Sequence, residues 1–246
     1  MEVNILQTSL ADFNKEKTLR FDVKFHRVFT YLIKKKDTVP LLNFFTIIDK
    51  RIKIENLDLD NLKYVEIGSC DEYGDVYPFD LSNKDLEVVE KNRLLKKIQA
   101  GDIQKPNKYN LLIPAVRPNL KKFIFIDDEK SELYFTKAFL CLESRENRLS
   151  TLLLSYLLRT ILLKTLVGLC REGKGYPTIK KDDLKFFYIE KELVKKILNL
   201  QPKLLEKITS NTKNIKKYKG EIKKLREEID QSMYQIINSL KTENLA

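Results

Sequence analysis

Histidine, cysteine and glycine are scarce in this sequence, and each shortage removes a class of function. His26 is the only histidine in 246 residues, so a catalytic Ser/His/Asp set or a histidine metal site has little to build on. Cys70, Cys141 and Cys170 are far apart and odd in number, which indicates a reducing cytoplasm and no disulfide framework. No glycine fingerprint for a dinucleotide or a methyl donor is present. We therefore expect no metal, no cofactor and no catalytic residues.

Motifs for phosphate binding and for membrane insertion are incomplete as well. Gly168 to Gly175 nearly spells a P-loop, but glycine follows Lys174, so the hydroxyl that binds magnesium is missing. The apolar run 152–169 carries Arg159 and Lys164, each of which costs about 2.5 to 3.5 kcal/mol at a bilayer centre. Residues 1–17 lack the apolar core of a secretory signal. We expect a cytoplasmic protein without a membrane partner, in which the apolar run is a buried helix.

Basic residues, by contrast, are abundant. The formal net charge is +11 and the pI is near 9.3, which favours an anionic partner, with nucleic acid ahead of a membrane surface. Lysine, isoleucine and asparagine are all frequent, as A/T-rich coding alone would make them. The charge therefore favours nucleic-acid binding without deciding it.

Hydrophobic patterns divide the chain into a strand-rich part and a helical part. An amphipathic helix is predicted over 20–36, and the first 145 residues are otherwise expected to be mainly β. The predicted strands are 41–49, 62–68, 110–116, 123–127 and 138–142, with turns at Gly74 and at Gly101-Asp102. A continuous apolar helix is predicted over 149–170, followed by a glycine-rich turn over 171–177, a strand over 186–189 and a helix over 191–200. The predicted class is α+β, a mixed α/β domain followed by a long C-terminal helix.

The last helix carries a heptad pattern. Isoleucine returns at every seventh position from Ile208 to Ile236, and Pro202 is expected in the first turn. A helix over 203–241 is roughly 58 Å long at 1.5 Å per residue, too long for a small domain to cover. We expect a coiled coil with a second copy or a partner; the alternative is an amphipathic helix lying on its own domain. The residues predicted to form the seam are Leu204, Ile208, Ile215, Tyr218, Ile222, Leu225, Ile229 and Ile236.

Three predicted loops mix arginine, lysine, asparagine and tyrosine. Such loops suit DNA, because cations meet phosphates while Arg and Asn make bidentate contacts to guanine and adenine edges. The alternative is ordinary solvated loops in a lysine-rich protein. The candidate DNA-binding residues are Lys105, Asn107, Lys108 and Tyr109; Arg117, Asn119 and Lys121; and Arg171, Lys174, Tyr176 and Lys180.

The order of several short motifs resembles the specificity subunits of type I restriction-modification systems. The motifs are the segments 20–25, 64–68, 101–103, 116–120, 173–177 and 181–184, followed by the long helix. The resemblance implies a target-recognition domain over 1–190 and a helical spacer over 191–246. Family members carry two recognition domains and two long helices, and this chain has one of each, which implies a half-subunit that pairs with itself.

The resemblance also implies function and partners. It implies double-stranded DNA recognition without catalysis, with methyltransferase (modification) subunits, and a restriction subunit in some complexes, as partners. A homodimer would read two half-sites. Two other interpretations stay open: the recognition end of a fused restriction-methylation enzyme, and a coiled-coil adaptor whose basic loops are incidental.

Overall fold

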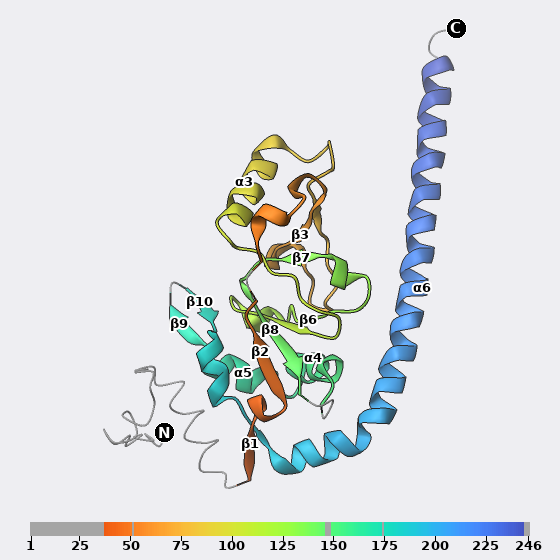
Figure 1. The fold of residues 1–246 in the computed structure, drawn as a ribbon. Helices are drawn as coiled ribbons and strands as arrows, with labels where there is room; N and C mark the ends of the chain where they lie inside the picture. The colour runs from red at the N-terminus through yellow and green to blue at the C-terminus, as the bar shows by residue number, and fades with distance from the viewer. Residues whose placement is uncertain (1–36, 51, 146–148, 174, 244–246) are drawn as a thin grey trace, which may run out of the picture. The chain divides into compact units, whose positions relative to one another are not determined.

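The computed structural model describes residues 37–50, 52–145, 149–173 and 175–243 (Figure 1). The helix predicted over 20–36, with His26, lies outside the described residues. The chain divides into two compact units, Met1–Asn199 and Leu200–Ala246. Strands and short helices make up the described part of the first unit, and the long helix α6 (Lys191–Glu243) occupies the described part of the second. The predicted α+β class with a long C-terminal helix is confirmed.

A four-stranded antiparallel sheet lies at the centre of the first unit. Its order is β2 (Phe45–Ile48), β8 (Phe139–Ser144), β5 (Leu111–Pro114) and β6 (Ile124–Phe125). Ile48 pairs with Cys141, and Pro114 pairs with Phe139. Both β2 and β5 therefore end where β8 begins. Four of the predicted strands overlap these four, because their β-branched and aromatic runs are buried in the core.

A smaller sheet pairs with a helix that the sequence pattern did not predict. β3 (Lys63–Val65) lies between β4 (Phe79–Asp80) and β7 (Tyr134–Phe135), antiparallel to the first and parallel to the second. Helix α3 (Val88–Gln99) follows β4, so the expectation of one leading helix in the first 145 residues is wrong.

Two features explain why α3 forms. Leu94 and Ile98, four residues apart, are fully buried with Tyr64 in one core cluster. On its other side, the Arg93 guanidinium bonds both Glu90 and Glu66. The alternation of basic and apolar residues in this segment hides a buried helical stripe only about one turn long, from Leu94 to Ile98.

The apolar run 149–170 forms two helices, so the prediction of one continuous helix is wrong. α4 (Thr151–Arg159) and α5 (Leu163–Leu169) meet at 81°. At the break, the Thr160 hydroxyl donates to the Tyr156 carbonyl at 2.8 Å, which competes with helix propagation. The bend lets both apolar helices be buried. Within the described residues, no single helix is long and apolar enough to cross a membrane, and only this bent pair meets that test jointly.

Arg159 ties the break to the rest of the first unit. Its guanidinium donates to the carbonyls of Glu72 (2.8 Å), Ser155 (3.1 Å) and Phe123. Burial lowers the pKa of this guanidinium, which stays protonated because its unperturbed value is so high. One half-buried cation thus holds α4, the start of β6 and the loop before β4 together.

Two strand pairs complete the first unit. β1 (Thr38–Pro40) pairs with β11 (Tyr188–Glu190), within which the predicted strand 186–189 partly lies. β9 (Arg171–Gly173) and β10 (Tyr176–Thr178) form a hairpin where only a turn was predicted. The short 3-10 helices η1 to η7 are Leu41–Asn43, Ile54–Asn56, Leu59–Asn61, Ile67–Ser69, Pro118–Leu120, Lys130–Glu132 and Lys181–Phe186.

Pro202 lies inside α6 and not in the first turn of a separate helix, so this prediction is wrong. The helical pattern of 191–200 continues past the proline, although the proline removes one helical N–H donor and its ring crowds the carbonyl of the preceding turn. The helix therefore begins twelve positions earlier than predicted for the heptad segment, at Lys191 rather than Lys203.

A substitution at Gly74 tests whether the Arg159 guanidinium holds these segments together. Its φ is +88°, and a Cβ there would lie 2.6 Å from Arg159 Nη2 and 2.6 Å from the Phe123 carbonyl oxygen. We expect Gly74→Ala to lower the free energy of unfolding by the left-handed backbone cost of about 1 to 2 kcal/mol, plus about 1 to 3 kcal/mol from displaced hydrogen bonds. Urea unfolding measures the loss.

Two other glycines serve as controls for this substitution. Gly101 has φ +84°, and a Cβ at this position would have nothing within 4 Å, so Gly101→Ala should show the backbone cost alone. Gly68 has neither constraint, and Gly68→Ala should be nearly neutral. A loss for Gly74→Ala no larger than that for Gly101→Ala would contradict the role given to Arg159.

Candidate nucleic-acid interface

One end of the central sheet gathers basic side chains from separate segments. Lys50 follows β2, Arg117 follows β5 and Lys137 precedes β8, so strand pairing brings them to the same end. Lys181 reaches this end as well, because its ammonium pairs with Asp49 at 3.1 Å. We call this surface the basic end, and its members are Lys50, Arg117, Asn119, Lys121, Lys137, Tyr176, Lys180 and Lys181.

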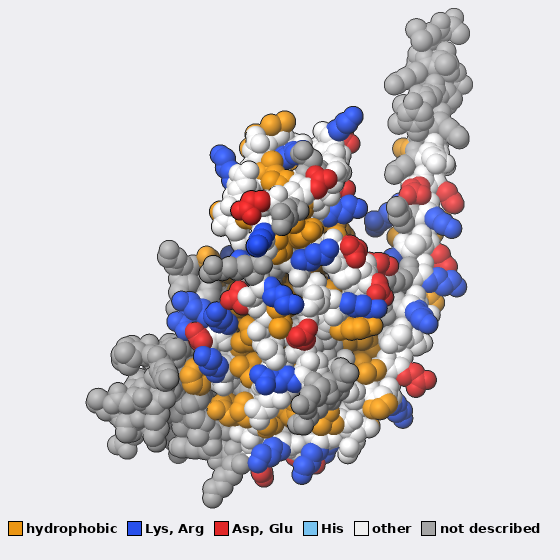
Figure 2. All heavy atoms as spheres, in the orientation of Figure 1, with side chains coloured by type: hydrophobic (Ala, Val, Ile, Leu, Met, Phe, Trp, Pro, Cys, Tyr) orange, Lys and Arg blue, Asp and Glu red, His pale blue; other side chains and the backbone are white. Residues whose placement is uncertain are grey.

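Two of the three predicted loops meet in the basic end. The Arg117 N–H donates to the Pro177 carbonyl at 2.8 Å, and Val116 bridges to Thr178. The Arg117 guanidinium carbon lies 5.1 Å from the centre of the Tyr176 ring. Figure 2 shows basic side chains grouped over the β9–β10 hairpin. The pairing of hairpin and loop therefore joins residues about sixty positions apart into one surface.

Backbone conformation marks the same loops. Tyr109, Arg117 and Lys121 have φ values of 67°, 52° and 60°, and they are the non-glycine residues with positive φ in the described part of the chain. Left-handed conformations are uncommon for such residues and cluster at functional sites. Arg117 and Lys121 lie immediately before and after η5, so the constrained backbone of this turn fixes the direction in which each side chain leaves it.

The third predicted loop, 105–109, is not brought to the basic end. It leads into the opposite end of β5, where Tyr109 N–H donates to the Ile126 carbonyl. Lys108 pairs with Asp128 at 2.5 Å, which raises the pKa of its ammonium, and Lys105 pairs with Glu132 at 3.7 Å. Asn107 closes a turn with Asn110. Lys105 and Lys108 are therefore both partly neutralised by acids, as Lys181 of the basic end is by Asp49.

Arg171 holds the hairpin in place. Its guanidinium forms a bidentate pair with Asp183, whose side chain is fully buried, at 2.9 and 3.0 Å. Asp183 also accepts from the Lys180 N–H at 2.8 Å. Arg171 therefore positions the hairpin beside η7 instead of presenting its charge to solvent. Lys174, another predicted contact, lies outside the described residues.

Sequence reasoning missed three lysines of the basic end, at positions 50, 137 and 181. The signal was present for the first two, because Lys50 directly follows the predicted strand 41–49 and Lys137 directly precedes the predicted strand 138–142. Lateral pairing of those two strands places both lysines together. The position of Lys181 depends on its pair with Asp49, 132 residues away in sequence, which no local pattern contains.

Metal-binding and nucleophilic side chains bear on the chemistry available at this surface. In the described ranges, no cluster of three or more His, Cys, Asp or Glu side chains is placed to hold a metal ion. The three cysteines are buried, and burial raises the pKa of the Cys70 and Cys141 thiols to about 12 each, so neither forms a thiolate near neutral pH. The surface offers exposed cations, an asparagine and a tyrosine ring.

Comparisons with known proteins give a limited result. No protein-family model matches the sequence, and no curated protein matches it. Among solved structures, the chain is similar to one from a type I R-M system, with a TM-score of 0.47, 12% identity and 70% of this chain covered. It is also similar to the HsdS subunit from Thermoanaerobacter tengcongensis, with a TM-score of 0.45, 13% identity and 70% of this chain covered. Each alignment covers 43% of the solved chain, so this chain spans less than half of those proteins. Both belong to the class of system that the sequence resembles.

The Arg171–Asp183 pair gives a second test. We expect Arg171→Met to lower the free energy of unfolding by about 3 to 5 kcal/mol, because it leaves the Asp183 carboxylate buried and unpaired. The double variant Arg171→Met with Asp183→Leu should recover much of that loss, since replacing both partners by apolar side chains removes the uncompensated charge. Urea unfolding measures both. A single variant as stable as the parent would show that Arg171 is not a structural residue.

Proposed function

We propose that this chain recognises DNA sequence, as the specificity subunit of a type I restriction-modification complex in single-domain form. The observation that supports it most is the contact between Arg117 and Tyr176, which unites two predicted DNA-binding loops beside Lys137 and Lys181. The basic end concentrates cations from several segments, and among the described residues Lys181 is its one lysine paired with an acid, whereas Lys105 and Lys108 at the opposite end are both paired with acids.

The members of the basic end divide by chemistry. Lysine ammonium groups at positions 50, 121, 137 and 181 suit phosphates, which fix register and supply the salt-dependent part of affinity. Arg117 and Asn119 suit base edges, because both make bidentate contacts to purines in the major groove. Both are exposed, and both lie in the turn that left-handed residues constrain. Recognition of sequence is therefore assigned to 117–121, and attachment to the surrounding lysines.

Helix α6 supplies the second part of the proposal. Ile215, Ile222 and Ile229 recur on one face and are 51%, 50% and 61% exposed. Tyr218 and Leu225 lie between them and are exposed as well. An apolar stripe with a seven-residue period favours pairing with a second copy of the same helix. A homodimer would present two identical recognition domains to two half-sites, and its helices would offer a surface for methyltransferase subunits.

DNA binding is tested by replacing basic residues with neutral ones, one at a time, at the two ends of the sheet. We expect Lys137→Gln to weaken binding to all duplex sequences and to reduce the salt slope by about 0.9, as loss of one phosphate contact should. Arg117→Ala should cost about 1 to 3 kcal/mol on the preferred sequence and relax the preference at one position. Fluorescence anisotropy across a salt series, with a selected duplex, measures both effects.

Lys108→Gln is the matched control, since Lys108 is exposed and lies at the opposite end of β5. It should leave affinity and salt slope unchanged. Equal losses for Lys108→Gln and Lys137→Gln would refute the assignment of the basic end. An affinity that does not respond to salt would favour the coiled-coil adaptor.

Self-association is tested on α6. We expect Ile222→Lys and Ile229→Lys each to convert a dimer to a monomer, because a lysine in the seam places like charges opposite one another. Gly220→Lys adds the same charge to the helix outside the heptad seam, where nothing lies within 4 Å, and should leave the dimer intact. Light scattering at micromolar concentration reports the mass. A monomeric parent chain, alone and with modification subunits, would sink the homodimer.

A further inference from the structure

The backbone around Arg117 is fixed against the segment that contains β10. The Arg117 N–H donates to the Pro177 carbonyl at 2.8 Å, and the Ile179 N–H donates to the Ala115 carbonyl at 2.8 Å. The residues between these two bonds form a β-bridge. Ile179 is 1% exposed, so the core anchors this pairing. The φ of 52° at Arg117 is therefore held by bonds on both of its neighbouring segments, and its side chain leaves the backbone in one direction.

The Tyr176 ring supports the guanidinium at the far end of that side chain. The guanidinium carbon lies over the ring, 5.1 Å from its centre. Such a contact is made with the face of the ring and uses no N–H donor of the arginine. With the part of the chain that the structure describes, the exposed Arg117 guanidinium makes no hydrogen bond and no ion pair. Its direction is thus restrained while its donors stay available.

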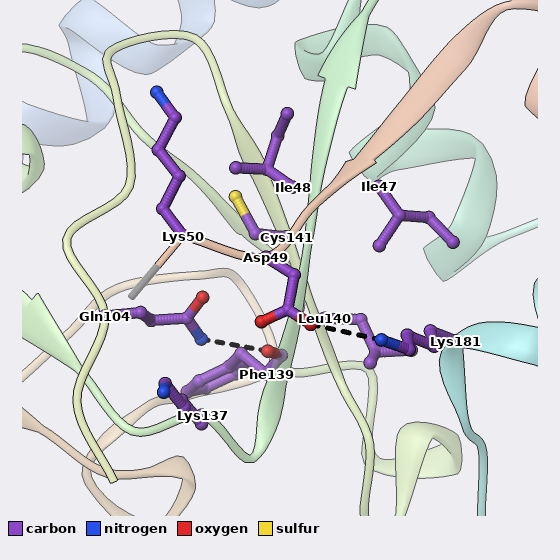
Figure 3. Close-up of a pocket in the computed structure, with 10 residues that line it drawn as sticks. All are labelled: Ile47, Ile48, Asp49, Lys50, Gln104, Lys137, Phe139, Leu140, Cys141 and Lys181. Carbon is purple, nitrogen blue, oxygen red and sulfur yellow. Dashed lines mark hydrogen bonds and ion pairs between the residues drawn. The ribbon is translucent and has the colours of Figure 1, made fainter. Parts of the chain in front are cut away.

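Neighbouring polar side chains at this end of the sheet are used within the chain. Figure 3 shows Lys181 paired with Asp49, at 3.1 Å, and the Gln104 amide bonded to the Phe139 carbonyl, at 2.9 Å. The remaining lysines carry compact charges that define no plane. Arg117 differs from all of these groups, because it offers a planar fork of uncommitted donors.

A planar fork of donors selects among the bases. In the major groove guanine presents two neighbouring acceptors, O6 and N7, which match both arms of the fork. Adenine places an amino donor beside its N7, cytosine presents a donor, and thymine presents a single acceptor beside its methyl group. Guanine is therefore the base that fits a restrained arginine best.

We propose that Arg117 reads a guanine and that Tyr176 is the positioning residue that holds the guanidinium for this contact. Tyr176 acts through Arg117 and makes no base contact of its own. Its ring restricts a long side chain before DNA arrives, so less rotamer freedom is lost on binding. The proposal rests on the proposed function, since it takes the basic end to be the surface that binds DNA.

The guanine contact is tested with modified DNA and the full-length chain. Each guanine of the selected duplex is replaced in turn by 7-deazaguanine, which keeps base pairing and lacks the N7 acceptor. We expect one replacement to weaken binding by the parent chain by at least about fivefold, and to have no effect on binding by Arg117→Ala. Fluorescence anisotropy measures both. A selected duplex without any sensitive guanine would overturn the guanine assignment.

The positioning role is tested by two substitutions of Tyr176. Tyr176→Ala should reduce the penalty at the sensitive guanine and leave the salt slope unchanged, because the phosphate contacts remain. Tyr176→Phe keeps the ring and should behave as the parent. Tyr176→Ala combined with Arg117→Ala should bind no more weakly than Arg117→Ala alone, since the two residues act as one unit. Urea unfolding checks that each variant keeps its fold.

Three results would overturn the positioning role. They are an unchanged guanine penalty in Tyr176→Ala, additive losses in the double variant, and a loss in Tyr176→Phe as large as that in Tyr176→Ala. The last result would assign the tyrosine hydroxyl to a DNA contact of its own.

Tyr109→Ala is the matched control. Tyr109 is exposed and also contacts a cation, since Lys108 Nζ lies 4.8 Å from its ring centre, but it lies at the opposite end of β5. This variant should keep the full guanine penalty, and a reduced penalty would contradict the specific link between Tyr176 and Arg117. The two proposals can be told apart when they fail. Salt-dependent binding that requires Arg117 but no guanine N7 overturns this inference alone, whereas a chain that binds no duplex overturns both.

Discussion

The position of β8 between β2 and β5 is the constraint on which the basic end depends. Because β8 runs antiparallel to both neighbours, the ends of β2 and β5 and the start of β8 meet at one end of the sheet. Lys50, Arg117 and Lys137 come together for that reason alone. The hairpin β9–β10 then adds Tyr176, since the backbone on either side of Arg117 pairs with β10.

Buried charge stabilises the parts around this sheet. Arg159 donates to carbonyls in three segments, and Asp183 is fully buried against Arg171. Each group is satisfied by several hydrogen bonds, which is the condition under which a charge is tolerated inside a protein. The apolar core fills the space between elements, and these charges set where the loop before β4 and the hairpin lie.

Patterns local in sequence predict much of this fold. The strands around Ile47, Leu112, Ile124 and Cys141 follow from apolar runs, and the long last helix follows from its heptads. Helix α3 was missed because its buried stripe, Leu94 and Ile98, is short. The break after Arg159 was missed because the apolar run gives no sign that the Thr160 hydroxyl bonds the Tyr156 carbonyl, and because the partners of Arg159, Glu72 and Phe123, are far away in the sequence. The candidate surface is predicted only in part. The loop containing Arg117 is recognisable by its composition, but its contact with Tyr176 and its position near Lys181 depend on tertiary pairing.

The heptad period of α6 bears on the geometry of any DNA site read by two copies. Seven residues of helix rise roughly 10 Å, and B-DNA rises about 3.4 Å for each base pair. One heptad therefore corresponds to about three base pairs along the duplex, close to a third of its helical turn. If two copies pair along this stripe through helices that lie parallel to the duplex, adding one heptad to each helix would change their spacing by about three base pairs and rotate the second recognition surface around the double helix. Insertions of one or two residues are excluded from this series, because they would turn Ile222 and Ile229 out of the seam.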